Sequence, residues 1–169
     1  MKTIETERLM ICQLSIEDSE FILQLLNSPG WLKFIGNKNT KTISDAENYI
    51  INGPVKSYAE NGFGLCIVKL KKENIPVGMC GLIKRDSLED IDIGFALLPE
   101  YEGNGYALES VAAVLNYAKT DLGITKVVAI TDKRNINSIK LLEKSGLKFE
   151  RNILLNGEEE EVLLFRVYL

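Results

Sequence analysis

Residues 91–111 contain an expected strand, a glycine turn and an expected helix in direct succession, and this unit restricts what the chain can fold into. The alternating run IDIGFALL (91–98) ends at Pro99, Gly103 and Gly105 follow, and apolar residues then recur at helical spacing over 105–121. The first N–H groups of a helix lack partners inside it and attract anions, while glycine lets a ligand approach the backbone closely. The turn is therefore a candidate phosphate site, although a purely structural turn explains two glycines equally well.

Two common nucleotide-binding loops fit this turn poorly. A Walker loop ends in Gly-Lys-Ser/Thr, whereas Gly105 is followed by Tyr106 and Ala107. A dinucleotide fingerprint needs a third glycine, and Leu108 occupies that place. Nucleotide cofactors of these two kinds are therefore disfavoured.

The rest of the chain predicts one α+β domain, 1–169, without repeats or linkers. Strands separated by short polar turns predict an antiparallel meander, and the strand–helix–strand passage from 91 to 131 makes the sheet mixed. Residues 27–42 are expected to be irregular, and Gly53-Pro54 is expected to break the second helix. The other expected strands are 7–13, 63–70, 76–84, 126–131, 148–155 and 162–169, and the other helices are 17–27 (capped by Ser15), 44–60 and 135–145.

Composition favours a folded cytoplasmic protein. The chain is 46% hydrophobic with a net charge of −4, which argues against disorder. No apolar run reaches the roughly 20 residues of a membrane span. The N-terminal residues lack the order of a signal peptide. The cysteines, Cys12, Cys66 and Cys80, lie in apolar stretches as buried thiols do, which indicates a reducing compartment.

The chain contains no histidine, which removes Ser-His-Asp and Cys-His catalysis and the common histidine-containing zinc sites. The cysteine spacing does not suit a cysteine-only site either, so no metal is expected. An excess of 24 acidic over 20 basic residues argues against nucleic acid and acidic membranes as partners, and favours a cationic partner such as an amine.

Three segments resemble the GNAT acyltransferase superfamily, and more narrowly its ribosomal-protein N-terminal acetyltransferases: ETERLMICQLSIED, LPEYEGNGYALE and TDKRNINSIKLLEKSGLKFE. The likeness covers nearly the whole chain. It implies a mostly antiparallel sheet, flanked by helices, with a splayed parallel pair whose V-shaped opening lies between strands 91–98 and 126–131. It also implies direct transfer of acetyl from acetyl-CoA, within a ternary complex, to a primary amine of a protein N-terminus or a small molecule.

The resemblance also assigns the cofactor site. The family's Gln/Arg-x-x-Gly-x-Gly/Ala turn falls on Glu102, Gly103, Asn104, Gly105, Tyr106 and Ala107, with Glu102 departing from the pattern. The backbone of Phe95, Ala96 and Leu97 is expected to pair with the pantetheine amides, as an added strand does. Asn135 is expected to contact the cofactor and Ser138 to lie near the leaving sulfur, although helix capping explains this pair as well.

The catalytic residues carried over are Asp92 and Ser138. Asp92 falls where several members carry a proposed general base, and alternation directs it away from the side of Ile93. A solvated carboxylate on a strand face is the competing interpretation. Many members carry a tyrosine acid where this chain has Leu142, so Ser138 is the expected substitute.

Two further features have a structural interpretation beside the functional one. Glu109 matches a glutamate of that branch, and a stabilising role in the first helical turn is favoured. The segment 31–36 (WLKFIG) either walls the acceptor groove or packs in the core.

A non-catalytic acyl-CoA-binding or sensing module is the alternative function. The acceptor, the acyl chain preference and the oligomeric state cannot be read from the sequence, and a homodimer stays open.

Overall fold

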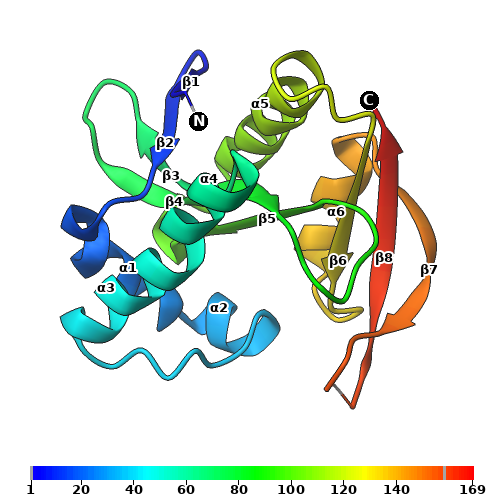
Figure 1. Ribbon diagram of the computed structural model, residues 1–169, viewed down its shortest axis with the longest axis horizontal. Coiled ribbons are helices and arrows are strands. Elements are labelled where there is room, and N and C mark those ends of the chain that lie inside the picture. Colours follow the sequence, from blue (N-terminus) through cyan, green and yellow to red (C-terminus); the bar gives the residue numbers. More distant parts are fainter. Residues whose placement is uncertain (1, 158) are drawn as a thin grey trace.

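The computed structural model describes residues 2–157 and 159–169, and in this part of the chain the strands form an eight-stranded mixed sheet (Figure 1). The strand order is β1-β2-β3-β4-β5-β6-β8-β7. The antiparallel meander expected over 63–98 is confirmed. The strands are β1 (Ile4–Glu5), β2 (Leu9–Gln13), β3 (Leu65–Leu70), β4 (Pro76–Ile83), β5 (Asp92–Leu97), β6 (Lys126–Thr131), β7 (Lys148–Leu154) and β8 (Glu161–Tyr168).

All the expected helices are present, but the structure adds a 3₁₀ turn at Pro99–Tyr101 and differs in two further places. Residues 27–42 are not wholly irregular, because Pro29 starts a short helix and its fixed φ suits that position. Gly53-Pro54 does not break the second helix either. Residues 51–55 form a π-helical turn, whose altered hydrogen bonding accommodates a residue that lacks an N–H. The helices are η1 (Ile16–Asp18), α1 (Ser19–Leu26), α2 (Pro29–Phe34), α3 (Ile43–Ile50), η2 (Ile51–Val55), α4 (Lys56–Asn61), η3 (Pro99–Tyr101), α5 (Tyr106–Thr120) and α6 (Ile136–Lys144).

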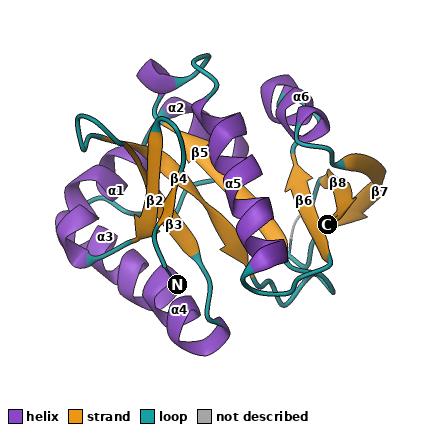
Figure 2. Cartoon of the chain, turned by 90° about the horizontal axis from the view of Figure 1, so that it is seen from above, coloured by secondary structure: helices purple, strands orange, loops and turns teal. Residues whose placement is uncertain are grey.

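Helices cover both faces of the sheet (Figure 2). Alternation along the central strands divides the core in two: Ile67 and Met79 pack with α1, α2 and α3, whereas Val68 and Cys80 pack with α5. We call the first side the α1–α3 face and the second the α5 face. In the described residues, none of the helices is long and apolar enough to cross a membrane.

The expected parting of two parallel strands is confirmed. The register of β5 with β6 consists of one pair, Asp92 with Val128. By contrast, every residue of β5 pairs with a residue of β4. Beyond that pair β5 and β6 diverge (Figure 1), so the β5 backbone from Phe95 to Leu97 presents its β6 side as an open edge. Helices α5 and α6 lie on either side of this opening (Figure 2).

Close approach of β3 and β4 depends on Gly81. A Cβ at this position would lie 2.2 Å from the Gly64 carbonyl oxygen and 2.7 Å from the Leu65 Cα. We therefore expect Gly81→Ala to lower the free energy of unfolding by about 1–3 kcal/mol through overpacking. Urea denaturation measures this change.

The matched control is Gly53→Ala, because a Cβ there meets nothing within 4 Å. It should leave the free energy of unfolding unchanged or raise it slightly, since alanine restricts the unfolded chain more than glycine does. Equal destabilisation of both variants would contradict the close approach.

Candidate functional site

The glycine turn has the backbone geometry of an anion cradle. Gly103 and Gly105 adopt φ values of +75° and +80°, a region that glycine enters without steric cost. The N–H of Glu109 donates to the Gly105 carbonyl at 3.0 Å, as the first turn of α5 closes. The N–H groups of the preceding residues, Tyr106 to Leu108, therefore have no acceptor within the helix, as at any helix start. The turn can bind a phosphate through its main chain.

An ion pair from the far end of the chain holds this turn in place. Arg8 donates from Nε to Glu109 Oε2 at 2.7 Å and from Nη1 to the Asn104 carbonyl at 3.0 Å. Its guanidinium also stacks on the Tyr106 ring, 4.7 Å from the centroid. We call this set the Arg8–Glu109 clamp. Sequence reasoning missed Arg8, because nothing near it in the sequence marks it as a partner of the turn.

Glu109 has the structural role favoured from the sequence. Besides the Arg8 side chain, it accepts hydrogen bonds from the Thr6 hydroxyl and the Arg8 backbone N–H. Burial by itself raises the pKa of Glu109, but the hydrogen bonds from Thr6 and Arg8 outweigh burial and hold this pKa below its ordinary value. The carboxylate therefore stays ionised and joins β1 and β2 to α5.

Asp92 is buried rather than solvated on a strand face. It is 1% exposed, and its sheet partner Ile83 places its side chain on the α1–α3 face, opposite to Ile93. Burial raises the pKa of Asp92 to about 6, against the lowering effects of the Arg85 charge and hydrogen bond and of the Ile130 backbone N–H. Its Oδ2 accepts from Arg85 Nε at 2.6 Å, while its buried Oδ1 has no hydrogen-bond partner among the described residues. A buried carboxylate oxygen without a protein donor can accept a hydrogen bond from a bound ligand or a water molecule.

Arg85 and Tyr49 accompany Asp92, and sequence reasoning missed both. Arg85 follows β4 and reaches back to the start of β5, with 37% of its side chain exposed. Tyr49 belongs to α3; burial raises the pKa of its hydroxyl to about 12, and the Arg85 charge opposes this shift. The polar group therefore combines residues from the sheet and from a helix that covers it.

The start of α6 provides the other expected site residues. The Asn135 side chain accepts from the Ser138 backbone N–H at 3.1 Å, so Asn135 caps α6 as the structural interpretation expected. Ser138 is half-buried in the first turn. Leu142 is fully buried in the core, so an aliphatic side chain stands where the resemblance expects a tyrosine acid.

Trp31 packs in the core rather than forming an exposed wall. It is 5% exposed and belongs to the cluster around α1 and α3. Its Nε1 is buried without a hydrogen-bond partner in the described part of the chain. The α2 helix still lies beside the glycine turn, because a Cβ on Gly30 would be 3.8 Å from Glu102 Oε1.

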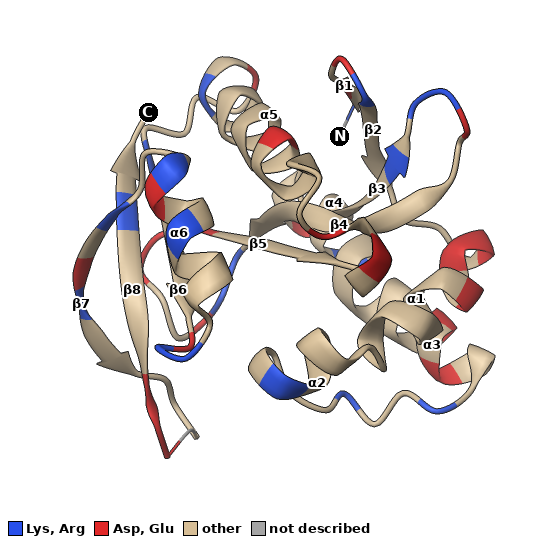
Figure 3. Ribbon diagram, turned by 180° about the vertical axis from the view of Figure 1, so that it is seen from behind, with Lys and Arg blue, Asp and Glu red and all other residues tan. Residues whose placement is uncertain are grey.

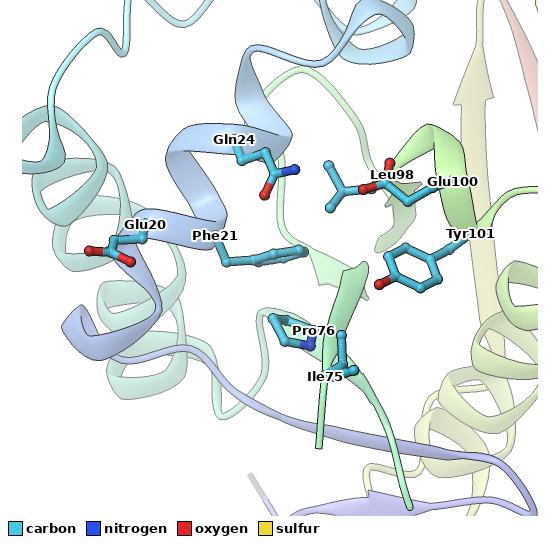
Figure 4. A pocket seen from close by; sticks show the side chains of 8 residues that line it. All are labelled: Glu20, Phe21, Gln24, Ile75, Pro76, Leu98, Glu100 and Tyr101. Carbon is cyan, nitrogen blue, oxygen red and sulfur yellow. The ribbon is translucent and has the colours of Figure 1, made fainter. Parts of the chain in front are cut away.

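Two grooves lie on the α1–α3 side of the molecule. The first, of about 290 Å³, is at the end of β5 away from Asp92; Phe21 and Tyr101 border it, with Glu20 and Glu100 at its rim (Figure 4). The second, of about 220 Å³, includes Val128, the residue paired with Asp92. We call the second one the β6–β8 groove, because Leu164 and Arg166 of β8 also line it. Asp90 and Val128 bring this groove close to Asp92, although Asp92 itself does not line it.

Charges around the β6–β8 groove are largely paired with one another. Asp90 binds Lys126 at 2.7 Å and Arg166 at 3.0 Å, and Arg166 also binds Glu150. Figure 3 shows Lys and Arg interleaved with Asp and Glu on β7 and β8, whereas acidic residues gather near α1. Within residues 2–157 and 159–169, no group of His, Cys, Asp and Glu side chains is arranged to hold a metal ion.

The Arg8–Glu109 clamp predicts a stability effect. Glu109→Ala removes three hydrogen bonds, one of them charge-assisted on both sides, so we expect the free energy of unfolding to fall by about 1–3 kcal/mol. Thermal and urea unfolding measure the loss. Glu73→Ala, which changes an exposed glutamate in the β3–β4 turn, is the control and should shift stability by less than about 0.5 kcal/mol. Similar effects for both variants would refute the clamp.

Comparison with known proteins agrees with this geometry. Residues 8–148 match the model of the acetyltransferase (GNAT) domain family. The chain is 28% identical to the uncharacterized N-acetyltransferase p20 of Bacillus licheniformis, over 95% of this chain and 89% of that protein.

Solved structures share the fold over the whole chain. An acetyltransferase from Agrobacterium tumefaciens superposes with a TM-score of 0.86 at 20% identity, covering 100% of this chain and 95% of the other. A putative ribosomal-protein-serine acetyltransferase from Vibrio cholerae gives 0.81 at 19% identity, with coverage of 99% and 98%. The fold is therefore shared with the branch that the sequence resembles.

With the family match over most of its length, the splayed strand pair and the glycine turn, the chain belongs to the GNAT family of acetyl-CoA-dependent acetyltransferases.

Proposed function

We propose that this protein acetylates the primary amine of a small molecule or a peptide, with Asp92 as the general base. One observation carries the proposal: an open β-edge leads from the glycine turn to a buried carboxylate that has an unpartnered oxygen. A donor bound along that edge would end beside Asp92, on the side where the β6–β8 groove lies.

The chain's own groups fit acetyl-CoA, which supplies the activated acyl group. The main chain from Glu102 to Ala107 would bind its pyrophosphate, because the two glycines keep Cβ atoms away from the free N–H groups. The open edge of Phe95, Ala96 and Leu97 would pair with the pantetheine amides. Asn135 and Ser138, at the start of α6, would contact the cofactor from the other side of the opening.

Asp92 suits the base because of its environment. An amine with a pKa of about 10 enters protonated, and its nitrogen attacks the acyl carbon only after losing a proton. With a pKa of about 6, Asp92 is largely ionised at neutral pH and can accept that proton. Its Oδ1 is buried, so the amine reaches it after side chains shift or through one water molecule.

Ser138 is the proposed proton donor to the departing sulfur. The carbon–sulfur bond breaks as the new carbon–nitrogen bond forms, and the sulfur carries the electron pair away. A thiol with a pKa of about 8.5 leaves tolerably as a thiolate, so this donor contributes less than Asp92. The buried Leu142 supports Ser138, because no proton can come from that position.

The second candidate, an acyl-CoA sensor without turnover, also has support in Leu142. Release of free thiol from acetyl-CoA with a panel of peptides, polyamines and other amines distinguishes the two, since a sensor binds the cofactor and releases none. A cytoplasmic location remains part of the proposal and is supported by the burial of the Cys66 and Cys80 thiols.

The pyrophosphate cradle is tested at Gly103. Gly103→Val should weaken coenzyme A binding by at least about tenfold, because the new side chain projects from the turn that must approach the pyrophosphate. Isothermal titration with coenzyme A measures the affinity. Gly123→Val is the matched control, since both glycines have positive φ (+75° and +65°) and open space around the missing Cβ.

Both variants should lose similar stability from backbone strain, about 1–2 kcal/mol. Only Gly103→Val should lose affinity. Wild-type affinity in Gly103→Val would refute this placement. We prefer Gly103 to Gly105 because a Cβ on Gly105 would lie 3.3 Å from Arg8 Nη2 and would disturb the clamp as well.

The role of Asp92 is tested by the pH dependence of kcat/KM for an amine with a pKa near 10. In the wild type, kcat/KM should rise with pH up to about 6, as Asp92 ionises, and then level off until the amine itself titrates. Asp92→Asn should lower kcat/KM by about 10²–10⁴-fold at pH 7. Without a base, its kcat/KM should keep rising tenfold per pH unit, following the free amine alone.

Asp86→Asn, at an exposed carboxylate of the β4–β5 loop, is the control and should keep the wild-type profile. If Asp92→Asn also keeps that profile, Asp92 is not the base.

A further inference from the structure

Asp92 and Arg85, near the point where β5 and β6 part, carry opposite charge, and each keeps unused hydrogen-bonding capacity. Asp92 Oδ1 accepts no hydrogen bond, and neither Nη of Arg85 donates one to any of the described residues. The same two side chains are joined through Arg85 Nε and Asp92 Oδ2 at 2.6 Å. A carboxylate and a guanidinium therefore lie side by side, each with unused hydrogen-bonding capacity.

Neighbouring charges do not explain this free capacity. Around the groove Asp90 is paired with Lys126 and Arg166, and Arg151 with Glu150 at 2.8 Å. The Arg85 side chain is 37% exposed, so its Nη groups can meet a ligand at the surface while Nε remains on Asp92. Arg85 also begins the stretch that leads into the loop Ser87–Asp90, which walls the groove.

Resting on the proposed function, we propose that the acceptor is a zwitterion with an anionic group next to its amine, typically a free α-amino acid, and that Arg85 binds its carboxylate. The ammonium and carboxylate of an α-amino acid are adjacent, as are Asp92 and Arg85, so the charges of ligand and protein match pairwise. Arginine suits this role because its Nη groups can bind a carboxylate in a charge-assisted, bidentate manner.

The same pair disfavours other amines. A polyamine places a second cation near Arg85, and a protein N-terminus has a neutral amide carbonyl where the carboxylate would lie. Either acceptor would exclude water from the Arg85 guanidinium without supplying a negative charge to pair with it.

The experiment compares kcat/KM for the proteinogenic L-amino acids with that for their carboxamides, in the wild type and in Arg85→Gln. Wild-type protein should acetylate at least one amino acid, and its carboxamide should be about 10–100-fold poorer. Arg85→Gln should lower kcat/KM for that amino acid by a similar factor. It should change kcat/KM for the carboxamide much less. Arg85→Lys should restore part of the difference.

Measuring both acceptors in the wild type and in Arg85→Gln separates recognition from structure. A purely structural loss would lower kcat/KM for the amino acid and for its carboxamide equally. Lys71→Gln, which removes a positive charge at the remote β3–β4 turn, is the control and should keep the wild-type preference for the amino acid.

Three results would overturn the inference. If carboxamides, peptides or polyamines are acetylated as well as amino acids, or if Arg85→Gln keeps the preference, Arg85 does not select a carboxylate and the acetyltransferase proposal stands. If none of these acceptors releases thiol while acetyl-CoA binds, both this inference and the proposed function fail.

Discussion

The parting of β5 and β6 is the constraint on which the rest of the structure depends. Their parallel pairing amounts to Asp92 and Val128, and every residue of β5 after Asp92 keeps a partner in β4 alone. Sheet backbone groups without a partner attract a further strand or a strand-like ligand. The opening therefore runs between the glycine turn at one end and the Asp92 carboxylate at the other, as the proposed binding of pantetheine requires.

Such an opening is useful only if its two sides are held rigidly. The Arg8–Glu109 clamp does this at the cradle by joining the first strands to α5, across about a hundred residues of sequence. The glycines keep the backbone open, and Arg8 binds the Asn104 carbonyl between them. A turn that is already shaped for its ligand loses less conformational entropy on binding and positions the reacting group more accurately.

Burial and charge are balanced against each other at Asp92. Removing a carboxylate from water favours its neutral form, while Arg85 favours the ionised one, and the resulting pKa of about 6 lies between an ordinary aspartate and neutral pH. The pair is also incomplete, because one carboxylate oxygen and the Nη groups remain available. A buried carboxylate with an unpartnered oxygen is costly for stability, and such costs are typical of binding and catalytic sites.

The sequence by itself determined the order of most strands and helices, the glycine turn and the exclusion of histidine chemistry. The exclusion follows from composition, and the other features depend on backbone preferences and apolar periodicity, which act over a few neighbouring residues. Tertiary structure alone decided that α2 forms, that a π-helical turn accommodates Pro54 and that Trp31 packs in the core. It also decided that Arg8 contacts the glycine turn and that Arg85 pairs with Asp92. Arg8 binds Glu109 because the first strands pack against α5, and Arg85 binds Asp92 because the β4–β5 loop folds back. Such contacts depend on packing between distant segments, which local sequence patterns do not encode.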